Sequence, residues 1–194
     1  MNALLDPIRF RPRDGGPSFT LRHRLFRLAW TIVWNGLGVW TPTPLFAWRR
    51  ALARAFGARI AATARIYPRV RIWHPPHLEM AERACLARGV DCYCMAPVRL
   101  GAHALVSQGA RLCAGDHDVD DPDFRLRVRP IVLGAEAWVA AEAFVGPGVT
   151  LQEGAVLGAR GVAFRDLGAW TVHVGNPARP LRARRRPASS TNAD

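Results

Sequence analysis

The chain has 194 residues, of which 49% are apolar and 22% are charged, a composition that excludes a wholly disordered chain and allows one sizeable core. Its formal net charge is +12, and all 27 basic residues are arginines. Because the sequence has no lysine, mechanisms that need a Schiff-base lysine or a Walker-type lysine are excluded.

The positive charge is concentrated at the two ends of the chain. Residues 1–59 hold 10 arginines and 2 aspartates, residues 181–194 hold 4 arginines and 1 aspartate, and residues 60–180 are nearly neutral. A nucleic-acid-binding protein usually carries its charge on the folded binding face, so we expect no nucleic acid as a partner. Basic ends are typical of contact with a membrane surface or of a disordered tail, and we expect such a tail over residues 181–194.

The cysteines indicate a reducing compartment. The four cysteines are Cys85, Cys92, Cys94 and Cys113. They form no CxxC motif, and their spacing is not that of zinc ligands. The first 20 residues are polar, are interrupted by prolines and glycines, and do not resemble a cleavable signal peptide. We therefore expect reduced thiols, no metal, and a cytoplasmic protein, with the inner face of the cytoplasmic membrane as a more specific alternative.

The N-terminal region is expected to form an irregular arm over residues 1–18 and amphipathic helices over residues 19–57. Apolar side chains recur there with helical spacing at Leu21, Leu25, Leu28 and Ile32. Four tryptophans lie in a stretch without charged residues, at Trp30, Trp34, Trp40 and Trp48. Glycines and prolines leave this stretch too short to span a bilayer. Two interpretations stay open: residues 20–56 pack on the main domain, or they contact a membrane surface.

From Ile60 onward the aliphatic residues recur every six positions. Five consecutive hexads open at Leu133, Val139, Val145, Leu151 and Leu157, and earlier ones at Ile60, Ile66, Ile72, Met80, Leu86, Cys92, Leu100, Val106 and Leu112. Two gaps of eight residues among the earlier openers indicate insertions at corners. A period of six fits neither an amphipathic helix nor an alternating strand, and it predicts short parallel strands joined by tight corners. Three hexads complete one triangular coil, and stacked coils bury one continuous core.

Several short motifs accompany these repeats, namely Phe56-Gly57-Ala58, Ser107-Gln108-Gly109-Ala110, Gly115-Asp116-His117-Asp118, Val145-Gly146-Pro147-Gly148-Val149 and Val174-Gly175-Asn176-Pro177-Ala178-Arg179. In them the chain resembles the hexapeptide-repeat acyltransferases, and most of all the exopolysaccharide O-acetyltransferases of the colanic-acid type (WcaF-like). The resemblance implies a left-handed parallel β-helix over residues 58–180. It also implies acetyl transfer from acetyl-CoA to a sugar hydroxyl or a lipid-linked oligosaccharide, by a homotrimer with each active site between two subunits.

The six-residue period fails between Leu112 and Leu133, and we predict an active-site loop over residues 114–130. A long insertion on a rigid scaffold is a common place for a functional site. Acetyl transfer to a hydroxyl needs a base near neutral pH, which an imidazole can supply. We therefore predict His117 as the general base, as the resemblance also implies, with Asp116 or Asp118 orienting its ring or holding a sugar hydroxyl. The alternative is a solvated polar loop with an incidental histidine.

The resemblance assigns the cofactor groove to five residues. Ala141 and Ala159 are expected to offer main-chain groups to the pantetheine, and Trp138 to lie near the acetyl or acceptor end. Arg165 and Arg179 are expected to bind the phosphates of acetyl-CoA. Relatives often have Thr-Lys where this chain has Phe164-Arg165, so the charge is kept and a hydroxyl contact is lost.

The acceptor side is less clear from the sequence. The expected acceptor-binding residues are Cys94, Asp118 and Trp138, although relatives often have an asparagine where this chain has Cys94. A zinc enzyme would need three converging histidines, and the spacing of His74, His77 and His117 does not match such a site. Two alternatives to the O-acetyltransferase remain: an N-acyltransferase that acts on an amino sugar, and a non-catalytic β-helix scaffold.

Overall fold

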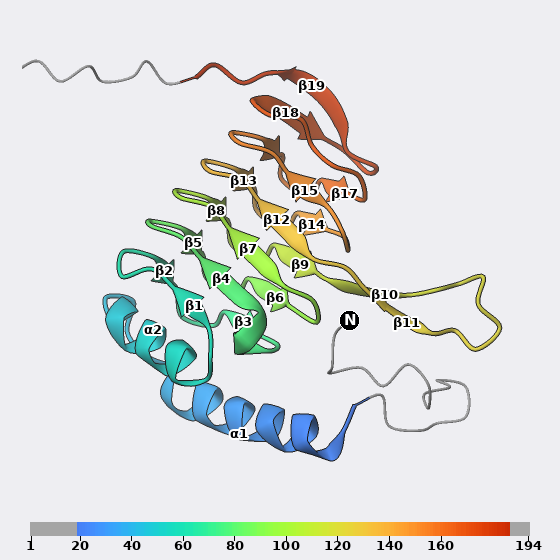
Figure 1. Cartoon of the computed structure of the whole chain (residues 1–194). Coiled ribbons are helices and arrows are strands. Elements are labelled where there is room, and N and C mark those ends of the chain that lie inside the picture. Colours follow the sequence, from blue (N-terminus) through green and yellow to red (C-terminus); the bar gives the residue numbers. More distant parts are fainter. Residues whose placement is uncertain (1–18, 187–194) are drawn as a thin grey trace, which may run out of the picture.

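The computed structural model describes residues 19–186, in which two helices precede a stack of short strands (Figure 1). The helices are α1 (Leu21–Leu37) and α2 (Phe46–Ala55). The strands of the first coils are β1 (Arg59–Ile60), β2 (Arg65–Ile66), β3 (Arg71–Ile72), β4 (Leu78–Met80), β5 (Cys85–Leu86), β6 (Asp91–Tyr93), β7 (Val98–Leu100), β8 (Leu105–Val106) and β9 (Arg111–Cys113). A short 3-10 turn, η2 (Pro75–His77), lies between β3 and β4.

The later strands are β10 (Gly115–His117), β11 (Leu126–Val128), β12 (Ile131–Leu133), β13 (Trp138–Val139), β14 (Phe144–Val145), β15 (Thr150–Leu151), β16 (Val156–Leu157), β17 (Val162–Ala163), β18 (Thr171–Val174) and β19 (Arg179–Ala183). The protein is therefore mainly β, as the sequence predicts. Strands β10 and β11 form a separate antiparallel hairpin outside the stack.

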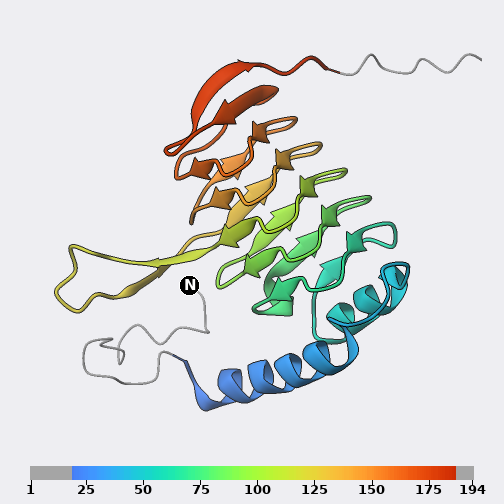
Figure 2. The same ribbon diagram turned by 180° about the vertical axis from the view of Figure 1, so that it is seen from behind.

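The remaining strands form the three sides of a parallel β-solenoid. Sheet A holds β1, β4, β7, β12 and β15; sheet B holds β2, β5, β8, β13, β16, β18 and β19; sheet C holds β3, β6, β9, β14 and β17. The chain visits sheets A, B and C in turn, and the coils stack with parallel pairing until β19, which runs antiparallel to β18. Figures 1 and 2 show the coils stacked above the two helices, which lie across the N-terminal end.

The register confirms the six-residue period. Hexad openers pair across each sheet, as Met80, Leu100 and Leu133 do in sheet A and Leu86, Val106 and Val139 do in sheet B. These side chains point inward and are buried, so one aliphatic residue from each sheet fills the interior of the solenoid in every coil. Small residues follow the openers because the coils pack closely: a Cβ atom on Gly134 would lie 2.7 Å from the backbone nitrogen of Glu153.

The insertions all lie at one corner of the solenoid. They follow Ile72, Cys92 and Leu112, each of which is the inward residue of a sheet C strand. The chain passes from sheet C to sheet A at this point, which we call the C–A corner. Because the inserted segments stack in successive coils, this corner collects most of the irregular chain, including η2 and the β10–β11 hairpin.

The first coil has a row of backbone carbonyls without strand partners. In the rest of the stack, amides of one coil donate to carbonyls of the next, as Tyr67 does to Leu86 and Trp73 to Cys92. No coil precedes the first one, so its own carbonyls in equivalent positions need other donors. Side chains of the two helices supply them: Arg54 to Ile60, Arg50 to Ala64, Arg49 to Ile66, Trp34 to Val70 and Trp30 to Ile72, with distances between 2.6 and 2.9 Å.

The tryptophans therefore divide into two groups. Trp30 and Trp34 are buried against the first coil, which confirms the packing interpretation for these two residues. Trp40 and Trp48 are 72% and 45% exposed. Buried Arg49 also donates to the carbonyls of Pro42 and Thr43, and so ties the segment between the helices to the coil.

The outer face of α1 is apolar, although the regular spacing of its leucines would usually mark a buried stripe. Its exposed side chains are Leu21, Leu25, Leu28 and Ile32, each more than half exposed. The helix instead turns His23, Trp30 and Trp34 toward the coil. The indole donors decide this orientation, because the first coil's carbonyls must be satisfied. Within residues 19–186, no helix combines the length and hydropathy that a membrane crossing requires.

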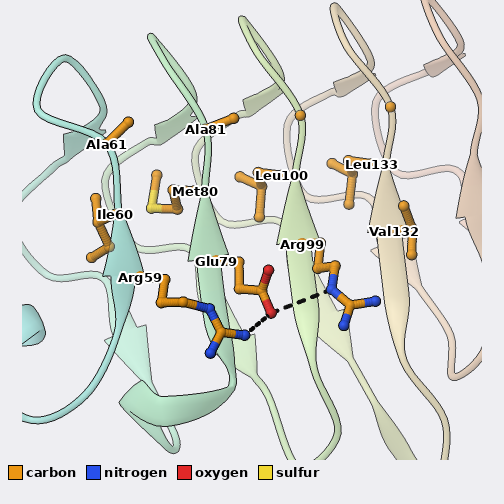
Figure 3. A pocket seen from close by; sticks show the side chains of 12 residues that line it. Arg59, Ile60, Ala61, Glu79, Met80, Ala81, Arg99, Leu100, Val132 and Leu133 are labelled. Atoms are coloured by element: carbon orange, nitrogen blue, oxygen red, sulfur yellow. Dashed lines mark hydrogen bonds and ion pairs between the residues drawn. The ribbon is translucent and has the colours of Figure 1, made fainter.

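The outer faces of sheets A and C carry matched charges. Glu79 lies between Arg59 and Arg99 across three strands of sheet A, in a shallow hollow of about 580 Å³ (Figure 3). On sheet C, Asp91 lies 3.7 Å from Arg71 and 4.0 Å from Arg111. The hollow on sheet A holds none of the predicted site residues, and its charged side chains pair with one another.

The edge carbonyls generate the first prediction. Trp34→Phe keeps an aromatic ring against the coil but leaves the buried carbonyl of Val70 without a donor. We expect a loss of about 1–3 kcal/mol in the free energy of unfolding, measured by chemical denaturation. Trp40→Phe is the matched control, because Trp40 is exposed and has no such bond. Equal stability of the two variants would contradict the assigned role of the indole N–H.

Candidate active site

The β10–β11 hairpin projects from the side of the stack at the C–A corner (Figures 1 and 2). Its two ends stay attached to the coil, since the amide of Ala114 donates to Tyr93 and the amide of Ile131 donates to Pro97. The coil therefore continues in register beneath the hairpin. His117 stands opposite Leu126 at the end of the paired region, outside the solenoid core.

His117 is oriented by Phe124. The Nδ1 atom lies 2.8 Å from the carbonyl oxygen of Phe124, and the two rings stack with centroids 4.6 Å apart. Phe124 adopts a left-handed backbone conformation (φ 52°), which is uncommon for a bulky residue. Because a carbonyl oxygen only accepts, Nδ1 carries the proton and donates it. In the neutral imidazole Nε2 is then the ring nitrogen with a free lone pair, as a general base requires.

The two predicted aspartates do not orient this ring. Asp116 pairs with Arg129 at 3.4 Å, and Asp118 pairs with Arg127 at 2.7 Å, across the hairpin. In this structure the Phe124 carbonyl, rather than either aspartate, bonds Nδ1 of His117, and a role for Asp116 or Asp118 toward a sugar hydroxyl stays a prediction. The Oδ1 atom of Asp116 is buried without a hydrogen-bond partner in the described part of the chain.

Trp138 lies on the opposite side of the coil from His117. It is 41% exposed on sheet B, where its indole donates to the hydroxyl of Ser107 at 2.9 Å. It lines a hollow of about 350 Å³ together with His103 and Arg184. Because the C–A corner faces sheet B across the triangular coil, one chain does not bring Trp138 and His117 into one site.

Cys94 lies beneath the surface. Its side chain has no exposed area, and its sulfur bonds the backbone amide and carbonyl of His74, each at 3.3 Å. The structure therefore gives no support to Cys94 as an acceptor contact, because its thiol is buried and bonded to the backbone of His74. Its neighbour Tyr93 is half-buried, and its ring is the accessible group at this place.

The predicted cofactor residues fall in two places. Arg165 and Arg179 line one pocket of about 250 Å³ at the C-terminal end of the coil, together with His173. Ala141 and Ala159 lie at the next corner after sheet B, where the amide of Arg160 bonds the carbonyl of Ala141. The amides of Ala141 and Ala159 donate no hydrogen bond within residues 19–186, so both are available to a ligand.

Comparisons with known proteins agree with this architecture. The chain is 39% identical over 155 residues to the colanic acid biosynthesis acetyltransferase WcaF of Escherichia coli, covering 80% of this chain and 85% of the relative. The chain belongs to the WcaF family of acetyltransferases. No family model matches it.

Solved structures show the same fold. A hexapeptide-repeat acetyltransferase from Vibrio cholerae, complexed with acetyl-coenzyme A, superposes with a TM-score of 0.75 at 21% identity, covering 94% of this chain and 97% of that one. A maltose O-acetyltransferase from Clostridium difficile also gives a TM-score of 0.75, at 19% identity and over 86% and 90% of the two chains. The recognition of a hexapeptide-repeat acetyltransferase from the sequence is confirmed.

Sequence reasoning missed the imidazole cluster beneath the C–A corner of this acetyltransferase. The ring centroid of His74 lies 4.8 Å from that of His23 and 4.7 Å from that of His77. Burial, together with the charges of its two histidine neighbours and of Arg27, lowers the pKa of His74 to about 3. Over residues 19–186, no group of three or more potential ligands is arranged to hold a metal ion.

The buried imidazoles make stability depend on pH. In the unfolded chain His74 binds a proton near pH 6.5, whereas in the folded acetyltransferase it stays neutral down to about pH 3. The unfolded state therefore binds more protons in this window. We expect the contribution of His74 to the free energy of unfolding to fall by up to about 1.4 kcal/mol per pH unit as the pH drops from 6.5 toward 3.

Chemical denaturation of the wild type and His74→Phe at several pH values tests this expectation. The variant should lose part of the dependence on pH below 6.5 and none of it above. His103→Asn, which removes an exposed imidazole at another corner, should keep the wild-type slope. Identical slopes for all three proteins would show that burial of His74 has no role in the acid sensitivity.

Proposed function

We propose that this protein transfers an acetyl group from acetyl-CoA to a sugar hydroxyl in exopolysaccharide biosynthesis, with His117 as the general base. The observation that carries the proposal is the hydrogen bond from Nδ1 of His117 to the Phe124 carbonyl. In the neutral imidazole this bond leaves the lone pair on Nε2. Membership in the WcaF family supports the reaction class, and the orientation of the His117 ring supports the choice of the base.

In the proposed reaction, Nε2 takes the proton of the acceptor hydroxyl as its oxygen attacks the thioester carbonyl of acetyl-CoA. The tetrahedral intermediate then breaks its carbon–sulfur bond, and the imidazolium returns the proton to the leaving thiolate. The products are an acetyl ester and free coenzyme A. In this proposal the carboxylate of Asp116, whose Oδ1 has no hydrogen-bond partner among residues 19–186, or that of Asp118 would accept a hydrogen bond from another hydroxyl of the sugar.

Acetyl-CoA would be held by the groups that are free of other partners. Arg165 and Arg179 share one pocket and would bind the phosphates. The amides of Ala141 and Ala159 would bind the pantetheine, and Trp138 would border the acetyl or acceptor end. The Vibrio cholerae structure, which has the same fold, contains acetyl-coenzyme A.

The positions of His117 and Trp138 support a trimeric enzyme. The hairpin leaves the coil at the C–A corner, whereas Trp138 lies on sheet B across the coil. One chain therefore holds the base and the predicted tryptophan in separate places. A site between two subunits would unite the hairpin of one with sheet B of its neighbour.

We further propose that α1 lies against an anionic membrane surface, at the inner face of the cytoplasmic membrane. Its outer face exposes Leu21, Leu25, Leu28 and Ile32, and the exposed Arg22 and Arg24 lie beside them. Residues 19–57 contain six arginines and no acidic residue, so the helix and an anionic lipid surface are complementary in charge.

The reaction is tested by separating binding from chemistry. His117→Ala should lower acetyl transfer by at least about 100-fold while acetyl-CoA binding, measured by calorimetry, stays the same. Arg165→Ala and Arg179→Ala should each weaken acetyl-CoA binding by about tenfold or more. Transfer at the wild-type rate by a folded His117→Ala variant would remove the general-base assignment, and unchanged binding by both arginine variants would remove the phosphate site.

Membrane contact is tested by sedimentation with liposomes that contain an anionic phospholipid. The wild type should sediment with them at physiological salt, and a Leu25→Ser/Ile32→Ser variant should remain in the supernatant. Leu181→Ser is the control, because it removes an exposed leucine from β19 at the other end of the coil. Absence of the wild type from the liposome pellet would contradict the proposal.

A further inference from the structure

A groove of about 320 Å³ runs between α1 and the outer face of sheet C. On the helix side it is lined by Arg27, Thr31 and Asn35, which share one face of α1 because they are four residues apart. On the sheet side it is lined by Trp73 and Tyr93, whose ring centroids are 5.6 Å apart. The groove therefore has aromatic walls and a polar rim.

Arg27 is the unusual member of this groove. Its guanidinium lies over the ring of Trp73, 4.0 Å from the ring centroid, and so has a fixed position. Its Nε atom is buried without a partner, and no hydrogen bond or ion pair to Arg27 occurs within residues 19–186. Burial lowers the pKa of Arg27, which is the cost of holding a cation here. Arg27 is half-buried, and a partly desolvated guanidinium with unused donors is a suitable ligand for an anion.

Among the charged side chains that line the groove, Arg27 is the one best suited to bind an anion. Asp91 is engaged by Arg71 and Arg111 along sheet C. Arg71 reaches the groove with an exposed side chain, so the lining carries two guanidinium groups and one carboxylate that is already paired. The net positive charge and the fork geometry of arginine favour a phosphate over a neutral ligand.

The groove leads toward the catalytic hairpin. Trp73, Tyr93 and Cys113 follow one another in successive coils, since Trp73 bonds Cys92 and Tyr93 pairs with Cys113. Two steps of about 4.8 Å separate the first from the last of these residues. Strand β10 begins two residues after Cys113. A ligand held by Arg27 would thus extend along Trp73 and Tyr93 to the base of the hairpin that carries His117.

We propose that this groove binds the phosphate of a phosphate-linked acceptor sugar, with Arg27 as the phosphate ligand and Tyr93 as a wall for the sugar. The proposal rests on the proposed acetyl transfer and names the class of its acceptor. Such a phosphate occurs both in sugars linked to a nucleoside diphosphate and in sugars linked to a lipid diphosphate. Arg27 acts on binding only, because it does not touch the reacting atoms.

The first experiment measures binding of glucose 1-phosphate by calorimetry without acetyl-CoA, with glucose as the phosphate-free probe. The wild type should bind the phosphate ester and not glucose, and Arg27→Gln should weaken the binding at least tenfold. Arg24→Gln is the matched control, because Arg24 is exposed on α1 and does not line the groove. A second pair of variants tests the site if Arg27→Gln fails to fold. Thr31→Glu adds a negative charge at the exposed rim and should weaken binding of the phosphate ester, whereas the uncharged Thr31→Gln should not.

The second experiment measures acetyl transfer to glucose carried on a nucleoside diphosphate and to glucose carried on a short polyprenyl diphosphate. For the better of the two acceptors, Arg27→Gln should raise KM at least tenfold and leave kcat within about twofold. The acceptor with the lower KM shows whether the groove prefers a sugar on a nucleoside diphosphate or a sugar on a lipid diphosphate.

Unchanged KM in Arg27→Gln, or equal weakening of acetyl-CoA binding by this variant, would overturn the acceptor assignment. Loss of transfer to every sugar, with phosphate binding intact, would instead reject the proposed reaction and leave the anion site standing.

Discussion

The first coil of the solenoid depends on finding donors for its edge carbonyls. Every later coil receives them from the amides of the coil before it, but the first coil begins a stack and has no such neighbour. Unpaired backbone acceptors at a buried edge destabilise a fold by about 1–3 kcal/mol each. The two helices solve this problem with side chains, and the positions of Trp30, Trp34, Arg49, Arg50 and Arg54 follow from it. The helical region is thus part of the solenoid's hydrogen-bond system rather than an appendage.

This constraint also explains why α1 presents apolar residues to solvent. One face of α1 contacts the coil, and Trp30 and Trp34 lie on that face because their indole N–H groups donate to its carbonyls. The leucines at helical spacing are left on the outside. The two functions proposed for α1 therefore use different faces: the outer face would meet a membrane surface, and the flank at Arg27 forms one wall of the groove. A lipid-linked phosphate bound in that groove would keep its lipid close to the exposed leucines.

Much of the fold was predictable because the interior of the solenoid admits only one kind of residue at each sixth position. The openers from Ile60 to Leu157 occupy the interior in register, and the insertions after Ile72, Cys92 and Leu112 recur at every third opener, a signal that already places them at one corner. The side-chain partners were not predictable in the same way. Cys94 is turned inward by its bonds to His74, and Asp116 and Asp118 pair with arginines that lie across the hairpin. Such pairings depend on strand register within an irregular insertion, which no periodic pattern reports.

The attachment of the hairpin has a consequence for how this protein can change. Ala114 and Ile131 leave and rejoin the coil next to each other, and both are bonded to the preceding coil. The segment between them can differ in length and composition while β9 still pairs with β14 and β7 with β12. The hairpin that carries the proposed base His117 is therefore an insertion whose strand pairing is separate from the pairing of the coils beneath it. A change in the hairpin can therefore alter the surroundings of His117 without altering the inward residues that hold the coils together.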